Sequence, residues 1–203
     1  MKKALFIITI LLLSFSLSAQ SAQDILNAVI EKNKAYKDIS ISFEYEFIDK
    51  TNDFSEMTGG YMYLKGDSFI INMDGQEMIS DGETLWTYLI DDQEVMISEV
   101  GEDNNTTPFA IINSFSQNVN VNFNISENNN TSLLIEEKEK TTFENVIINI
   151  DNDLKINDIS INTIDGSLIT YKIKSFKTNQ DLPDSMFFFD EKIHPNVEVI
   201  DMR

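Results

Sequence analysis

Regular alternation of apolar and polar residues is the feature that most limits how this chain can fold. Between residues 39 and 49 the sequence reads ISISFEYEFID, so every second residue is apolar and the residues between are mostly polar. A period of two is that of a β-strand with one face in a hydrophobic core and one face toward water. The pattern therefore predicts a strand over residues 39–49.

Similar patterns separated by short turns occupy most of the remaining chain. Residues 58–98 predict four or five strands, divided by turns at Gly66-Asp67, Asp74-Gly75, Asp81-Gly82 and Asp91-Asp92. Further strands follow after residue 118, with a hairpin turn at Asp165-Gly166 and a last strand in VEVID near the end. Short connections favour antiparallel neighbours, and the total is about 10–11 strands in one domain.

Two segments have a helical pattern instead. Ser21 can cap a helix over residues 21–36, whose apolar face contains Ile25, Leu26, Val29 and Ile30. A second, short helix is predicted after Thr107-Pro108, with apolar residues at three-residue spacing: Phe109, Ile112 and Phe115. A long run of antiparallel strands must curl, and a helix packed into the concave side of a curled sheet buries both apolar surfaces.

The first residues have the layout of a secretory signal peptide. A basic start at residues 1–3 precedes an uncharged apolar run and small residues at Ser18-Ala19. We expect residues 1–19 to be removed, leaving a single soluble domain over residues 20–203. The alternative is an uncleaved anchor, although the apolar run is shorter than the roughly 20 residues that span a bilayer.

Charge and cysteine content exclude several functions. The formal net charge of −19 argues against binding to nucleic acid or to anionic lipid surfaces. The chain has no cysteine, so it has neither a disulfide nor a site for lipid attachment at a cleavage point.

Signatures of catalysis and of metal binding are missing. There is one histidine, His194, no cysteine nucleophile, no G-x-S-x-G turn and no glycine-rich phosphate loop. Residues 151–158 resemble the start of a calcium loop, but Ile156 and Asn162 stand where such a loop needs glycine and an acidic residue. We therefore expect no enzymatic activity, no metal and no cofactor.

Large aromatic and methionine side chains gather on the early strands, between Phe43 and Tyr88. A tightly packed core more often uses Val, Ile and Leu, whereas flexible and aromatic side chains suit a cavity for apolar ligands of variable shape. Two interpretations remain open at this point, because the interior of an ordinary sheet is built from similar residues.

Four segments in a fixed order resemble the outer-membrane lipoprotein carrier proteins, the LolA family: GGYMYLKGDSFIIN, MISDGETLWTY, TTPFAIINS and FFFDEKIHPNVEVID. The similarity runs from about Phe43 to Asp201. DGETLWTY, which contains the only tryptophan, Trp86, is the most specific segment.

The resemblance implies a fold, a function and partners. The fold is an incomplete antiparallel β-barrel, α+β but mainly β, with helices as a lid over a hydrophobic cavity. The function is to shield the acyl chains of lipoproteins and carry them through the periplasm from the inner to the outer membrane, as a soluble monomer. The partners are acylated lipoproteins, an inner-membrane ABC-type release complex and an outer-membrane acceptor. The family often has an arginine that latches the lid where this chain has Gly66, beside Lys65.

The resemblance also suggests the residues of the site. The candidate walls of the cavity are Phe43, Tyr45, Phe47, Tyr61, Tyr63, Phe69, Ile71, Met73, Trp86 and Tyr88. The candidate lid residues are Phe109, Ile112 and Phe115. The alternation places each run of wall residues on one face of its strand without telling which face is concave. Competing hypotheses are a lipid-binding or lipid-sensing module on the same fold and a hydrolase.

Overall fold

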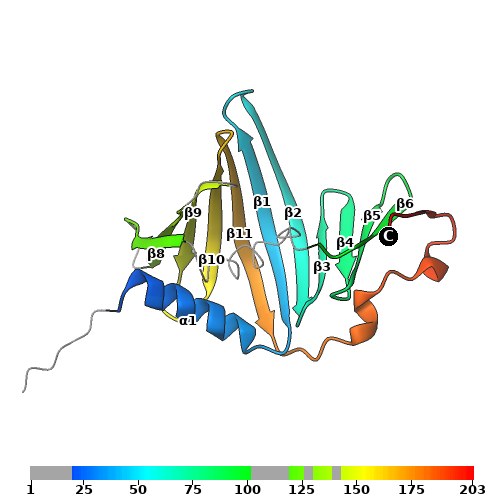
Figure 1. The fold of residues 1–203 in the computed structure, drawn as a ribbon, viewed down its shortest axis with the longest axis horizontal. Helices are drawn as coiled ribbons and strands as arrows, with labels where there is room; N and C mark the ends of the chain where they lie inside the picture. Colours follow the sequence, from blue (N-terminus) through cyan, green and yellow to red (C-terminus); the bar gives the residue numbers. More distant parts are fainter. Residues whose placement is uncertain (1–19, 102–118, 126–129, 139–142) are drawn as a thin grey trace, which may run out of the picture.

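The computed structural model describes residues 20–101, 119–125, 130–138 and 143–203 of the chain. These residues form one curved, twelve-stranded sheet that stays open, with one α-helix packed against it (Figure 1). The predicted class, mainly β with an incomplete antiparallel barrel, is confirmed. The described part has slightly more strands than the expected 10–11.

Helix α1 covers Ala22–Lys34, within the predicted range. Its N-cap is Ser21, whose side chain accepts a hydrogen bond from the Asp24 N–H at 3.1 Å, while the Asp24 carboxylate accepts from the Ser21 N–H at 3.1 Å. This reciprocal capping box satisfies two N–H groups that the first turn leaves without helical partners. The buried residues of the helix are Ala22, Leu26, Val29 and Ile30.

The chain then forms a meander of six strands, each antiparallel to the next. Their bounds are β1 Ile39–Asp49, β2 Phe54–Lys65, β3 Ser68–Met73, β4 Gln76–Ser80, β5 Thr84–Leu89 and β6 Glu94–Glu99. β1 has the predicted bounds because its alternation is unbroken. The turn between β3 and β4 needs left-handed backbone, which Asp74 and Gly75 adopt at φ values of 55° and 72°.

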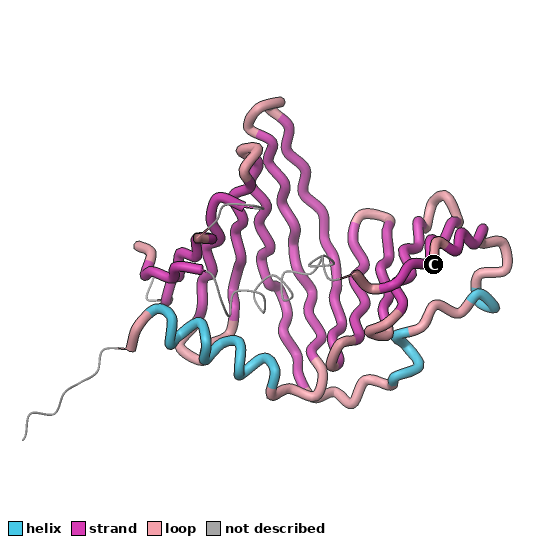
Figure 2. Tube along the Cα trace, in the orientation of Figure 1, coloured by secondary structure: helices cyan, strands magenta, loops and turns pink. Residues whose placement is uncertain are grey.

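A second meander continues with strands β7 Val119–Phe123, β8 Thr131–Glu137, β9 Phe143–Ile150, β10 Ile156–Thr163 and β11 Ser167–Thr178. The two meanders join where β11 pairs antiparallel with β1. The order across the sheet is β12-β6-β5-β4-β3-β2-β1-β11-β10-β9-β8-β7. Figure 2 shows the strands of this sheet in magenta, in the orientation of Figure 1. The pairing of β1 with β11 shifts register between Ser42 and Phe43, which marks a β-bulge.

After β11 the chain returns to the far edge of the sheet. It passes through two short 3₁₀ helices, η1 Asp184–Phe187 and η2 Glu191–Ile193, and ends in strand β12 Glu198–Asp201. β12 pairs with β6 in parallel orientation, which differs from the antiparallel neighbours expected for the sheet. The physical reason is the long crossing connection: only strands joined by short turns are forced to run antiparallel.

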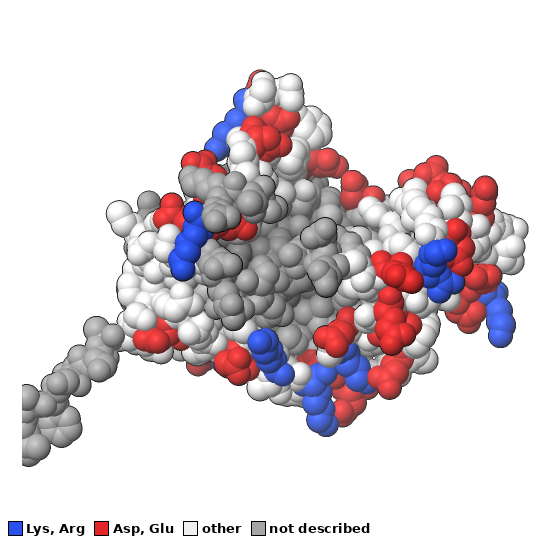
Figure 3. All heavy atoms as spheres, viewed as in Figure 1, with Lys and Arg blue, Asp and Glu red and all other residues white. Residues whose placement is uncertain are grey.

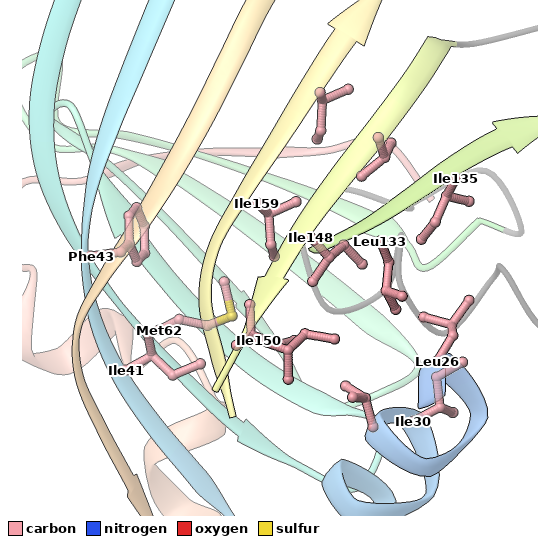
Figure 4. Close-up of a cluster of buried hydrophobic side chains, with 14 of the residues drawn as sticks. Leu26, Ile30, Ile41, Phe43, Met62, Leu133, Ile135, Ile148, Ile150 and Ile159 are labelled. Atoms are coloured by element: carbon pink, nitrogen blue, oxygen red, sulfur yellow. The ribbon is translucent and has the colours of Figure 1, made fainter. Parts of the chain in front are cut away.

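The main hydrophobic core lies between α1 and the sheet. Buried side chains of α1 form one cluster with Ile41 and Phe43 of β1, Met62 of β2 and residues of β8, β9 and β10. Figure 4 shows these side chains on the same side of the sheet, between the strands and the helix. We call this side of the sheet the helix face and the other side the opposite face.

Candidate functional site

The helix face contains six of the ten residues predicted to line a cavity. Phe43 and Ile71 belong to the buried cluster, and Tyr45, Phe69 and Met73 pack against it. Phe47 follows Tyr45 by two positions and is the strand partner of Ile169, another residue that packs against this cluster. The structure therefore brings these six residues together on one side of the sheet.

The other four predicted residues lie on the opposite face. Tyr63 and Trp86 pack in a separate cluster around Ile70, Ile79 and Phe187. Tyr61 lies two residues from Tyr63 on β2, and Tyr88 lies two residues from Trp86 on β5. Residues two apart on a strand share a face, so Tyr61 and Tyr88 also lie on the opposite face. The ten residues therefore lie on both sides of the sheet, six on the helix face and four on the opposite face.

An aromatic strip runs along the helix face away from α1. The Tyr171 ring of β11 lies 5.6 Å from Phe43 and 5.2 Å from Tyr45, between ring centroids. Further toward the β1–β2 turn, the rings of Phe47 and Phe54 lie 6.3 Å apart. Exposure rises along this path, from 3% for Phe43 to 50% for Phe54. The strip thus joins the buried core to an accessible apolar surface.

Gly60 makes room for the inner end of this strip. It is the strand partner of Phe43, and a Cβ atom at Gly60 would lie 2.6 Å from Cζ of Phe43 and 2.7 Å from the carbonyl oxygen of Asn72. Both distances are shorter than van der Waals contact, so any side chain here would displace the Phe43 ring. Sequence reasoning did not select Gly60, although a glycine inside a strand pattern often marks close approach of another group. It also missed Phe54 and Tyr171.

The two tyrosines of the strip remain uncharged at neutral pH. Burial raises the pKa of Tyr171 to about 12, with a smaller contribution from Tyr45. Burial, followed by the negative charges of Glu56 and Asp74, also raises the pKa of Tyr45. Neutral phenols keep the strip compatible with hydrocarbon, because a charged group facing an acyl chain would carry a large desolvation cost.

A pocket of about 360 Å³ opens at the other end of the helix face, where α1 ends. Its apolar lining includes Tyr36 and Leu64, which both pack against the main cluster, and its polar lining includes Lys34 and Lys37. The volume is at the lower end of the range for small-molecule sites. Asp38 and Asp67 line the pocket as well, so two carboxylates balance the two basic groups.

The opposite face of β3–β5 is covered by the C-terminal segment, residues 179–197. Phe187 is 1% exposed and packs against Ile70 and Ile79, while the rings of Phe188 and Trp86 lie 5.9 Å apart. The aromatic residues of DGETLWTY therefore hold this segment against the sheet. The partner sequence in this contact, FFF at residues 187–189, lies about one hundred residues after Trp86 in the chain.

Two charged residues bind the start of the C-terminal segment to the sheet. Asp38 is 1% exposed, and its carboxylate accepts hydrogen bonds from the N–H groups of Gln180 at 2.7 Å and Leu182 at 3.2 Å. Burial alone would raise the pKa of Asp38, but these backbone donors and the charge of Lys65 hold it below its usual value. Lys65 donates to the carbonyl of Leu182 at 2.6 Å and pairs with Asp184 at 2.5 Å.

Lys65, beside Gly66, thus contacts the C-terminal segment. The predicted lid residues Phe109, Ile112 and Phe115 lie outside the described residues. Within the described ranges, no group of three or more His, Asp or Glu side chains is placed to hold a metal ion. None of the helices in the described part has the length and hydropathy that a bilayer crossing requires.

A family model described as "Outer membrane lipoprotein carrier protein LolA" matches residues 16–190. The chain belongs to the LolA family. Its carrier proteins are non-enzymatic chaperones, so the expectation of a protein without catalytic activity is confirmed through the family. Membership also supports a lipoprotein carrier role, with lipoprotein cargo and membrane-associated partners in general.

Relatives that match most of the chain have names of this family. The outer-membrane lipoprotein carrier protein of Francisella philomiragia is 28% identical over 207 residues, covering 99% of this chain and 98% of the relative. That of Francisella tularensis is 25% identical over 192 residues, with 92% of each covered. A solved structure of an uncharacterized conserved protein from Thermus thermophilus shares the fold at a TM-score of 0.59 and 12% identity, covering 89% of this chain and 98% of that one.

Proposed function

We propose that this protein carries acylated lipoproteins through the periplasm, from the inner to the outer membrane, with their acyl chains against the helix face. The observation that supports this most is the aromatic strip, which passes from the buried core to an exposed end on the face that α1 covers. Membership of the lipoprotein carrier family gives this apolar surface its cargo class.

The physical need for such a surface follows from the hydrophobic effect. Each CH₂ group of an acyl chain costs about 0.8 kcal/mol when it is exposed to water, so a lipoprotein cannot leave a membrane unshielded. The helix face offers aromatic rings together with the flexible side chains of Met73 and Met78, which pack at the edge of the core. Such side chains adapt to chains of different length and curvature.

The partners and the route are part of the proposal. The chain would be secreted through its residues 1–19, receive cargo from an inner-membrane ABC-type release complex and deliver it to an outer-membrane acceptor as a monomer. Phe109, Ile112 and Phe115 would cover the bound acyl chains as a lid. Release requires open and closed forms that differ by only a few kcal/mol, because a more stable closed form would retain the cargo.

Neighbouring residues of β1 give a sharp test of the proposed face. A photoreactive phenylalanine analogue is placed at Phe47 on the helix face or, in a second variant, at Ile48 on the opposite face. Both positions are partly buried and lie one residue apart, so they differ mainly in direction. After irradiation of cells, we expect lipoprotein cross-links from Phe47 and few from Ile48.

Other outcomes would count against parts of the proposal. Equal cross-linking from both positions, or cross-linking only from Ile48, would contradict the assignment of the helix face. Mass spectrometry of protein purified from periplasm distinguishes a carrier from a lipid-binding module. An acylated lipoprotein that co-purifies would support the carrier function. Free fatty acid or phospholipid alone would favour a lipid-binding or lipid-sensing module.

A further inference from the structure

The negative charge of the protein is concentrated in one half of the sheet. Between Gly66 and Gly101, the segment with β3–β6, there are nine acidic residues and no Lys or Arg. Residues 179–203 add six acidic and two basic residues, so these two segments together account for −13 of the net charge of −19. Figure 3 shows acidic side chains gathered at this end of the molecule, with two basic patches among them.

The same end of the sheet finishes in strand β12, whose outer edge faces away from the other strands. The N–H group of Glu198 donates to the carbonyl of Gln93, just before β6, at 2.8 Å, and that of Met202 donates to the carbonyl of Ile97 in β6 at 2.9 Å. Because N–H directions alternate along a strand, the N–H and C=O groups of Val199 and Asp201 point to the outer edge. Such an edge can pair with another extended chain.

The side chains beside the outer edge of β12 are apolar and acidic, as expected for a surface that binds a partner. Val199, Ile200 and Met202 are 41%, 37% and 58% exposed, so each strand face at the edge presents apolar surface. Glu198 is the strand partner of Glu94, and like charges at such positions repel each other. The carboxylate of Asp201 is held by Arg203 at 2.8 Å, and this side-chain bond lowers the pKa of Asp201 to about 2. A cation next to Glu94 and Glu198 would relieve their repulsion.

We propose that the outer edge of β12 docks a basic, extended segment of a partner protein, which pairs as an additional strand. Backbone hydrogen bonds to Val199 and Asp201 give the register, and Lys or Arg side chains of the partner meet Glu94, Glu198 and the acidic turn at Asp91-Asp92. The same charge repels a second copy of the chain, anionic lipid and nucleic acid. The surface is separate from the helix face, so the proposal does not depend on the bound cargo.

The test uses the purified full-length mature protein and two synthetic hexapeptides, one alternating Arg and Val and one alternating Glu and Val. Backbone NMR spectra are recorded during titration at low and at moderate salt. We expect the basic peptide to shift the amides of β12 and β6, to slow hydrogen exchange at Val199 and Asp201, and to bind more weakly as salt increases. The acidic peptide should cause no such shifts.

Val199→Pro separates strand pairing from general attraction of charge. This substitution removes one outward N–H and leaves the bonds of β12 to β6 in place, which slow exchange of the Met202 amide would verify. One hydrogen bond is worth about 0.5–1.5 kcal/mol, so we expect the affinity to fall about 2- to 12-fold. Unchanged affinity in a variant that keeps the Met202 bond would overturn the pairing.

A matched pair of charge variants tests where on the protein the basic peptide binds. The first replaces Asp91, Glu94 and Glu198 by their amides, and the control replaces Asp53, Glu56 and Asp153, three acidic residues outside this end of the sheet. Both change the net charge equally. We expect at least a fivefold loss of affinity for the first variant and less than twofold for the control. Equal losses, or peptide shifts spread over the whole surface, would overturn the proposal.

Discussion

Replacing Asp38 is the change that should most clearly alter the C-terminal segment. The buried carboxylate holds the N–H groups of Gln180 and Leu182, and the segment that follows covers Trp86 with Phe187 and Phe188. Asp38→Ala leaves both donors without this acceptor and should release residues 180–189 from the opposite face.

The size of the effect follows from these contacts. A hydrogen bond to a charged acceptor contributes about 1.5–3 kcal/mol, so the loss of two should weaken docking of the segment by about 3–6 kcal/mol. Asp38→Asn keeps the shape and one acceptor oxygen but loses the charge and its attraction to Lys65. We therefore expect a smaller loss for this variant, about 1–3 kcal/mol.

Trp86 provides the assay because it is the only tryptophan in the chain. Release of the segment should shift its emission to longer wavelength and increase quenching by acrylamide. Hydrogen exchange should become faster in residues 184–189 and stay slow in β1 and β11, whose backbone pairing the substitution leaves in place. Emission, quenching and exchange that match the wild type in Asp38→Ala would refute the role given to this carboxylate.

The same residue predicts a pH dependence. The pKa of Asp38 is lower in the folded protein than the usual value of about 3.9. Its contribution to docking is therefore complete above about pH 4 and is lost as the pH falls through the folded-state pKa. Wild-type Trp86 emission should shift in this acid range, and the part of the shift due to Asp38 should be missing in Asp38→Asn. Equal acid shifts in the two proteins would contradict this assignment.

Two further substitutions test the packing of the helix face by urea unfolding. Gly60→Ala should lower the free energy of unfolding by about 1–3 kcal/mol, because the added Cβ meets Phe43 at 2.6 Å. In the control Gly59→Ala the added Cβ meets only a carbonyl oxygen at 3.8 Å, and equal losses in the two variants would contradict this explanation. Leu26→Ala removes a side chain of α1 that is 0% exposed and should cost about 2–5 kcal/mol; a loss below 1 kcal/mol would show that α1 contributes little to the core.

Local patterns in the sequence were sufficient to predict most of the strands and the first helix. The range of β1 and the capping of α1 by Ser21 follow from alternation and from cap chemistry, which involve only neighbouring residues. The parallel pairing of β12 with β6 could not be predicted in this way, because it depends on where a long connection crosses the sheet. The bulge at Phe43 likewise depends on the partner strand.

The same distinction applies to the candidate site. Alternation correctly grouped Phe43, Tyr45 and Phe47 on one face, but no local signal tells which face of a strand will meet α1. Trp86 was also predicted to line the cavity with its face left open, and its contacts with Phe187 and Phe188 place it on the opposite face. Contacts between residues so far apart in the chain become visible only in three dimensions.

The pairing of β1 with β11 at the middle of the sheet has a consequence for folding kinetics. Ile39 pairs with Thr178, so the central seam joins residues 139 positions apart, whereas most other strand pairs are sequence neighbours. Closing a loop of this length costs about 4 kcal/mol of chain entropy, and this cost must be met before the strand contacts can stabilise the seam. Each meander can form early by itself, and joining them is the slow step. While the chain is being synthesised, the apolar sides of both half-sheets therefore stay open until β11 has emerged.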